Sequence, residues 1–405
     1  MKSKMQRDVN WKEILYLACL CIYIIIFTLV RDGDVLTYVS FVKWDQYLDF
    51  INIIKIILVI KIVFDIVEEP GIIMIIGFTE VVDFMVYKHN SADVFLSMAL
   101  WFLCAGKNVR ARKITECLFA SHLISFVMMV VLCVTGILPF GETIKNGHTA
   151  VSYSLGFSHP NTAAAKIFQI VLLFWLLRKG RLRLIHYLGI IITMVVVKAV
   201  TDCSTVVLLL GLLLICTVLY NKRGVTQFLY RKITVVRNLF LAGYLGVLGI
   251  TTVFVCICKD GEIFKKLFGT FGARIAEAVK YYQYYGFSLW GQPLMYYKSD
   301  PKEAEKAGLY TLDNGYMYLL LGFGIVLFLY FIFLHAGTLW WMFERKRLDY
   351  VIVYGIFFIY GFLETLVIRT GMNFTLFYLF GFIWEYYDRR KQAENSRSRR
   401  LWQKN

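Results

Sequence analysis

The sequence predicts an all-α polytopic membrane protein with about twelve membrane-spanning helices and one large external loop. Hydrophobic residues make up 59% of the 405 residues and charged residues 18%, and the mean hydropathy is +0.61. A soluble chain of this length could not bury so much apolar side chain. Lys and Arg, in addition, concentrate in every second gap between the apolar runs, which is the positive-inside pattern of a membrane protein with several spans.

Twelve apolar runs approach the roughly 20 residues that a membrane-spanning helix needs. In chain order they are 14–30, 50–67, 71–87, 92–105, 114–138, 162–177, 184–200, 206–220, 239–258, 316–335, 350–367 and 372–386. The weakest candidates are the third run, which carries Glu80 and Asp83, and the short fourth run. We expect the first run to be retained as a membrane helix, since no small-residue cleavage site follows it.

The basic clusters predict the orientation of the chain. They lie at 2–12, 107–113, 178–183, 222–237, 345–347 and 389–404. We expect these clusters and both termini to be cytoplasmic. The outer segments are then 31–49, 88–91, 139–161, 201–205, 259–315 and 368–371. One short gap, Glu68-Glu69-Pro70, should lie inside although it has no cation.

The chain is expected to form one integral membrane domain, residues 1–387, with a basic cytoplasmic tail at 388–405 that contacts anionic lipid headgroups. The external loop 259–315 exceeds about 15 residues, a length that is uncommon unless the loop is functional. Its lysines do not conflict with the topology, because long loops are exempt from the charge rule. The sequence shows no internal repeat of the kind found in secondary transporters.

Two further classes are disfavoured by the composition. The net charge of +16 would suggest nucleic acid as the partner of a soluble protein. Here the excess lies in short inner loops and the tail, so no nucleic-acid partner is expected. The nine cysteines form no disulfide framework, and the six histidines have no metal-ligand spacing with them, so neither a metal nor another cofactor is expected.

One candidate site lies where an outer segment meets the sixth run, at Gly156-Phe-Ser-His-Pro-Asn-Thr-Ala. Asn161 is a favourable helix N-cap, and the simplest interpretation is a helix start that contains a histidine. The functional interpretation places His159 and Asn161 beside the free N–H groups of a helix N-terminus, which attract anions.

The long loop offers a second set of candidates. Its segment 272–284 is expected to be a helix with Arg274, Glu277 and Tyr281 on one face. This helix could simply be amphipathic and interfacial. Alternatively, Arg274 could bind a phosphate bidentately, while the rings of Tyr281 and Trp290 stack on sugars.

Three further candidates lie near the outer ends of the last spans. Asp313 precedes an apolar run, so it could cap a helix or act as a base for a sugar hydroxyl. Glu364 lies within the eleventh run, where a carboxylate is costly and is a functional candidate by default. Arg369 follows at the outer end of the same run, and Glu364 could instead pair with a neighbouring cation.

Other ionisable residues are expected to pair. Lys198 and Asp202 are four residues apart at the outer end of the seventh run. Lys166 lies one helical turn into the sixth run. In the second run, three residues could pair or reach the surface: Lys55, Lys61 and Asp65.

Five short motifs resemble those of the Wzy-like polysaccharide repeat-unit polymerases, within the O-antigen polymerase and O-antigen ligase superfamily. The similarity is greatest to Gram-positive capsule and exopolysaccharide members. It extends from about Lys12 to Tyr386 and rests on Gly156-Phe-Ser-His-Pro-Asn-Thr-Ala, Thr201-Asp-Cys-Ser-Thr, Ala273-Arg with Gly286 and Trp290-Gly-Gln, Leu312-Asp-Asn-Gly-Tyr, and Phe362-Leu-Glu.

The resemblance implies a membrane glycosyltransferase that joins undecaprenyl-pyrophosphate-linked oligosaccharide repeat units at the outer face of the bacterial cytoplasmic membrane. The family's Arg-containing loop motif corresponds to Arg274, with Gly291 downstream. Where relatives often read Asp-Ser-Arg, this chain has Asp202-Cys-Ser, so the role of that Arg is vacant or falls to Lys198. A flippase and a chain-length regulator are candidate protein partners.

Two alternatives remain: an O-antigen-ligase-like transferase, and a flippase or transporter of lipid-linked oligosaccharides. Few ionisable residues lie deep in the runs, and the polar candidates fall on one outer face, which favours an enzyme. The expected reaction is a metal-free, inverting transfer in which fixed cations stabilise the pyrophosphate leaving group. Arg274 is the first candidate for that role and Arg369 the second. His159 is the first candidate for the base, with Asp313 and Glu364 as alternatives.

Overall fold

The computed structural model describes residues 10–33, 35–39, 43–90, 94–144, 151–258, 261–295 and 301–390. Within these residues the regular structure is almost entirely helical, and β1 and β2 form one short antiparallel hairpin. The predicted all-α fold is therefore confirmed.

The elements follow the chain in a simple order. The first half contains α1 (Trp11–Phe27), the π-helix η1 (Thr28–Asp32), α2 (Val35–Tyr38), α3 (Trp44–Glu68), η2 (Pro70–Ile72), α4 (Ile73–His89), α5 (Val94–Ala105), α6 (Ala111–Val134), β1 (Glu142–Ile144), β2 (Val151–Tyr153) and α7 (Pro160–Leu177). The second half contains α8 (Leu184–Thr201), α9 (Ser204–Asn221), α10 (Arg223–Arg231), α11 (Ile233–Ile257), α12 (Glu262–Tyr285), α13 (Pro301–Lys306), α14 (Gly315–Glu344), α15 (Leu348–Leu363), η3 (Thr365–Ile368), η4 (Phe374–Tyr378) and a helix at 381–390.

Eight helices are long and apolar enough to cross a membrane, so the chain is a membrane protein with several spans. They are Trp11–Asp32, Pro70–His89, Ala111–Val134, Pro160–Leu177, Leu184–Thr201, Ser204–Asn221, Ile233–Ile257 and Gly315–Glu344. Each coincides with one of the predicted apolar runs.

The other four predicted runs differ from simple spans for physical reasons. α3 has 25 residues, but its apolar stretch carries Lys55, Lys61 and Asp65. α5 and α15 have only 12 and 16 residues. The run 372–386 is not one helix, because η4 has 3-10 geometry and the following helix begins only at residue 381.

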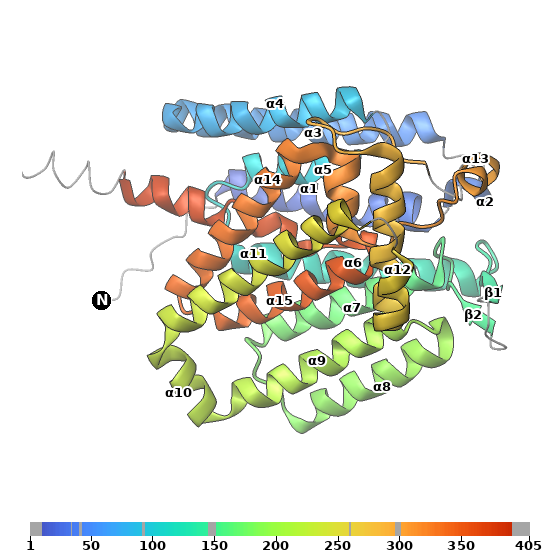
Figure 1. The fold of residues 1–405 in the computed structure, drawn as a ribbon. Helices are drawn as coiled ribbons and strands as arrows, with labels where there is room; N and C mark the ends of the chain where they lie inside the picture. Colours follow the sequence, from blue (N-terminus) through green and yellow to red (C-terminus); the bar gives the residue numbers. More distant parts are fainter. Residues whose placement is uncertain are drawn as a thin grey trace, which may run out of the picture.

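The long helices form a bundle whose two ends differ in charge. At one end of the bundle in Figure 1 lie α10 and the turn between α14 and α15. We call this the basic end, since the inner clusters 222–237 and 345–347 lie there. The opposite end carries α2, the β1–β2 hairpin, α12 and α13, and α12 runs crosswise over it. The structure thus separates these two predicted inner clusters from α12 and α13 of the long loop.

The gap Glu68-Glu69-Pro70 has no cation of its own, and ion pairs with other segments supply the missing positive charge. Lys12 Nζ lies 2.8 Å from Glu68 Oε1 and 3.1 Å from Asp65 Oδ1. Lys107 pairs with Glu69. Cations from two predicted inner segments therefore surround this gap, and it needs none of its own.

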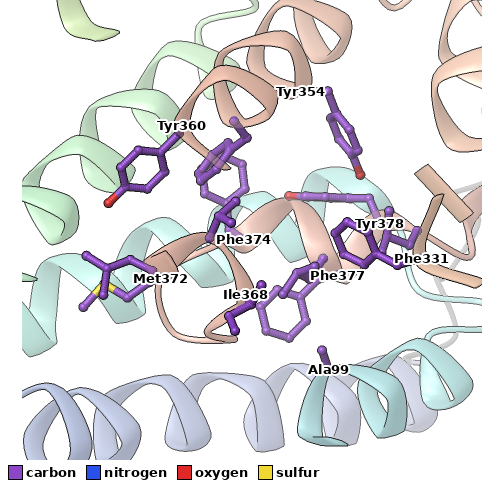
Figure 2. Packing of buried hydrophobic residues seen from close by; sticks show 14 of the residues in the cluster. Ala99, Phe331, Tyr354, Tyr360, Ile368, Met372, Phe374, Phe377 and Tyr378 are labelled. Atoms are coloured by element: carbon purple, nitrogen blue, oxygen red, sulfur yellow. The ribbon is translucent and has the colours of Figure 1, made fainter. Parts of the chain in front are cut away.

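The core is built around the 3-10 segments that precede the last helix. Figure 2 shows their side chains between α5 and α15: Ile368, Met372, Phe374, Phe377 and Tyr378, with Ala99 from α5 and Tyr354 and Tyr360 from α15. The Tyr354 hydroxyl donates a 2.7 Å hydrogen bond to the Thr375 carbonyl, so the packing also satisfies non-helical backbone.

α14 is broken at Gly324, which has φ = +86°. The segment that follows α12 inserts its backbone at the break. Ile325 N donates to Ser288 O at 3.0 Å, and Gln292 N donates to Gly322 O at 2.9 Å. Backbone groups freed inside a membrane helix are therefore satisfied by the long loop 259–315, as a break at membrane depth requires.

Candidate functional site

The predicted run 350–367 is interrupted near its end. α15 stops at Leu363, and Glu364 has extended backbone angles, φ = −151° and ψ = 141°. Asn373 stabilises the non-helical backbone after the break. Its side-chain amide donates to Val367 O at 2.7 Å, and its Oδ1 accepts from Thr375 N at 3.1 Å. Glu364 thus lies on fixed non-helical backbone rather than on a helix surface.

Glu364 lies at the meeting point of three elements. Its Oε1 accepts a 3.4 Å hydrogen bond from the side chain of Asn161 on α7. Arg274, on α12, places Nη2 4.0 Å from the same oxygen. The Nε of Arg274 donates to the Leu363 carbonyl at 2.7 Å, which fixes the guanidinium beside the break. We call Asn161, Arg274 and Glu364 the polar cluster; Glu364 is 7% exposed.

His159 supports this cluster through the start of α7. It is the N-cap residue, and its Nδ1 accepts a 3.1 Å hydrogen bond from Asn161 N. Asn161 was the predicted cap, but it lies one residue inside the helix, and its side chain contacts Glu364 instead. Since Nδ1 accepts from a peptide N–H, a neutral His159 carries its proton on Nε2.

Arg369 adds a second guanidinium near the break. It follows η3, and its carbonyl accepts from Met372 N at 2.8 Å. Arg274 therefore contacts Glu364, and Arg369 follows Glu364 by five residues, directly after η3.

A buried ionic layer lies beneath the polar cluster. Lys166 Nζ is 3.3 Å from Asp32 Oδ2 and donates to Thr28 Oγ1 and to Gly371 O, each at 2.9 Å. His122 Nδ1 lies 3.3 Å from the same ammonium. The side chains of this layer are fully buried. Lys166 thus ties three helices to the turn that follows Arg369.

Lys166 was a candidate from the sequence, whereas Asp32 and His122 were not. Asp32 was assigned to an outer segment, and His122 lay within an apolar run. A usable signal was present in each, because an ionisable residue in or at the end of a span requires a partner. The π-helix at Thr28–Asp32 is a second mark of this layer, since such distortions are frequent at functional sites.

Tyr281 lies on α12, and Asp313 lies just before α14, both in the long loop 259–315. The Tyr281 hydroxyl is within 3.0 Å of Met295 O and 2.9 Å of Tyr310 O, and the side chain is buried. Burial raises the pKa of this hydroxyl, with smaller contributions from neighbouring Tyr285, Glu277 and Asp313, so it stays protonated. Tyr281 therefore joins α12 to two other segments of the loop, at Met295 and Tyr310.

The predicted cap at the start of α14 differs from the observed one. Asn314, not Asp313, caps α14, with Oδ1 accepting from Tyr316 N at 3.1 Å. Asp313 lies one residue before the cap.

Trp290 and Lys198 lie in neighbouring structures. Trp290 belongs to the segment that fills the break in α14 and is half-buried. Lys198 forms the predicted ion pair with Asp202 and also donates to Ser204 Oγ at 3.0 Å. Lys198 is therefore held by residues close to it in sequence rather than by the polar cluster.

The cluster and its surroundings combine the fixed guanidinium of Arg274, a second arginine nearby in the chain, one carboxylate and one helix N-terminus. Such a set can bind an anionic group such as phosphate and can accept a proton from a hydroxyl. Among the described residues, no three His, Cys, Asp or Glu side chains lie together as metal ligands would. No protein-family model, curated protein or solved structure matches the chain.

Proposed function

We propose that the chain is a membrane glycosyltransferase that joins undecaprenyl-pyrophosphate-linked oligosaccharide repeat units. One observation carries the proposal: Arg274 lies beside Glu364, with Arg369 five residues further along the chain, where α12 crosses the end of the bundle opposite the basic end. In a bacterial cytoplasmic membrane with the basic end inside, this end of the bundle would lie toward the outer face. An exported lipid-linked donor would be met there.

The two arginines suit the leaving group. Cleavage of a glycosyl–pyrophosphate bond transfers negative charge to phosphate oxygens, and planar guanidinium groups bind such oxygens through two parallel hydrogen bonds. Arg274 is oriented in advance by its bond to Leu363 O. Preorganised cations aimed at developing charge stabilise the transition state by several kcal/mol.

Glu364 is the side chain best placed to accept the proton of the acceptor hydroxyl. Its carboxylate only accepts hydrogen bonds when ionised, and Asn161 and Arg274 fix its orientation. The other two candidates are less favourable. His159 uses Nδ1 to cap α7, so it must release the cap or shift its proton before it can act as a base. Asp313 lies next to the cap residue of α14.

A flippase or transporter is less consistent with the arrangement of charges. The buried pair of Lys61 and Asp65 lies at 2.7 Å, in the same network as Lys12 at the basic end. The buried pair of Lys166 and Asp32 lies beneath the polar cluster. Each of these two ion pairs is formed between groups at the same end of the bundle. A translocation path instead requires polar groups that successive gates expose.

The decisive experiment supplies purified lipid-linked repeat units to membranes that contain the wild-type chain or Glu364→Gln. We expect the wild type to release undecaprenyl pyrophosphate and to lengthen the glycan, and Glu364→Gln to do neither at matched protein level. Transfer of the glycan to an acceptor other than a repeat unit would identify a ligase. Movement of repeat units across the membrane without bond formation would identify a flippase and contradict the proposal.

A further inference from the structure

Two adjoining cavities lie at the basic end, on the far side of the bundle from the polar cluster. The first, the basic cavity, has a volume of about 350 Å³ and lies between the start of α6, the α7–α8 turn and the α14–α15 turn. Its charged lining residues are Arg112, Lys179, Arg181, Lys346, Arg347 and Asp349.

The basic cavity has an excess of positive charge. Two of its cations, Arg112 and Arg347, each pair with a carboxylate close to them in sequence. Lys179, Arg181 and Lys346 have no carboxylate partner in the part of the chain that the structure describes. Like charges around one cavity repel one another and attract an anion. The cavity therefore has the chemistry of an anionic headgroup site.

The second cavity, the apolar groove, has a volume of about 660 Å³. Its floor is α15, its walls are α9 and α11, and α10 borders it at the basic end. Tyr220 lines both cavities, and Leu348 of the groove directly follows Arg347 of the basic cavity. The two cavities together thus form one amphiphilic site with a cationic end and an apolar end.

The length of the groove distinguishes a lipid chain from a protein helix. From Leu348 to Ile359, both lining residues, α15 rises roughly 16 Å. This is about the depth of one leaflet, half of a hydrocarbon core of ~30 Å, whereas a partner's membrane helix would need the full thickness. The helix α10 has no buried residue and combines a groove-lining apolar face with Arg223 and Arg231, which is typical of a helix at headgroup depth.

We propose that the basic cavity and the apolar groove together bind one anionic phospholipid of the leaflet at the basic end. Lys179, Arg181 and Lys346 contact its phosphate, and one acyl chain lies along α15 in the groove. This site is separate from the proposed glycosyl-transfer site and does not depend on that function.

The test uses the purified full chain in neutral detergent and native mass spectrometry to count retained ligand. Three probes separate the contributions: phosphatidylglycerol, phosphatidylcholine with the same acyl chains, and glycerol 3-phosphate, which has no chain. We expect the chain to retain one phosphatidylglycerol and neither of the other two probes. Arg181→Gln/Lys346→Gln should weaken retention roughly 30-fold, given the contribution of a basic residue near an anionic headgroup.

Matched controls separate this site from general basicity. Arg178→Gln/Arg183→Gln removes the same charge from the same region without touching a lining residue, and retention should be unchanged. Gly243→Leu fills the groove and should abolish retention. Gly249→Leu, on the same helix, meets equally open space outside the groove and should not.

Three results would overturn the proposal. The first is equal retention of phosphatidylglycerol and phosphatidylcholine. The second is equal loss of retention in the two double variants. The third is that the Gly243→Leu substitution removes a second copy of the chain, rather than a lipid, from the species seen by native mass spectrometry.

Discussion

Lys166 in α7 donates a 2.9 Å hydrogen bond from Nζ to the carbonyl oxygen of Gly371, 205 residues further along the chain. The same carbonyl accepts from Gln169 Nε2 at 3.2 Å. These bonds hold the turn that follows Arg369 against the helix whose first turn carries Asn161. Two parts of the candidate site are therefore fixed to each other through buried groups.

Lys166→Met should destabilise the protein by about 3–5 kcal/mol, because it leaves the Asp32 carboxylate buried without its cation. The measurement is the free energy of unfolding in an SDS titration. Lys198→Met breaks a half-exposed ion pair and should cost at most about 1 kcal/mol. Asp32→Asn added to Lys166→Met should recover part of the loss. If Lys166→Met unfolds like the wild type, the ionic layer does not stabilise the fold.

Hydropathy and charge predicted the helices well but could not predict where they break. α15 ends at Leu363, and Asn373 bonds to the non-helical backbone that follows, while the apolar run continues through the break unchanged. The site was partly predictable. Arg274, Asn161 and Glu364 were candidates, but their meeting depends on α12 crossing the bundle end. Asp32 was missed because its partner Lys166 is distant in sequence.

Arg274→Lys should lower the rate of glycosyl transfer by about 10²-fold, even though the charge is kept. An ammonium group cannot both donate to the Leu363 carbonyl and offer two parallel hydrogen bonds to a phosphate, as a guanidinium can. Polymer length on isolated membranes, with protein level matched by blot, is the measurement. Lys280→Met, on the same helix and paired with Glu277, is the control and should polymerise normally. Wild-type polymer from Arg274→Ala would remove Arg274 from the site.

Gly291→Ala should destabilise the packing of the loop segment against the break in α14. Gly291 has φ = +95°, and a Cβ there would collide with the Gly322 carbonyl. We expect a loss of about 1–3 kcal/mol in the free energy of unfolding. Gly189→Ala, a helical position with open space around it, should be neutral or slightly stabilising. Equal effects in the two variants would show that the loop does not pack into α14 as described.

The orientation is tested by labelling engineered cysteines in a variant without the native ones. A cysteine at Lys302, exposed on α13, should react with a membrane-impermeant maleimide in intact cells. A cysteine at Arg231, on α10 at the basic end, should react only after permeabilisation. The reverse pattern would place the polar cluster on the cytoplasmic side and exclude a donor at the outer face.

The identity of the base can be decided with two substitutions, His159→Asn and Glu364→Gln. In His159→Asn, the amide oxygen replaces Nδ1 as the acceptor for Asn161 N, and Asn is a favourable N-cap, so α7 should start unchanged. We therefore expect polymer of normal length if His159 is a cap. Glu364→Gln keeps the shape of the side chain but cannot accept a proton, and its rate should fall by about 10²–10⁴-fold while single lipid-linked repeat units accumulate. Asp313→Asn is the matched control on the same face of the membrane. If His159→Asn fails and Glu364→Gln polymerises, His159 is the base after all, and the carboxylate serves only to orient Arg274.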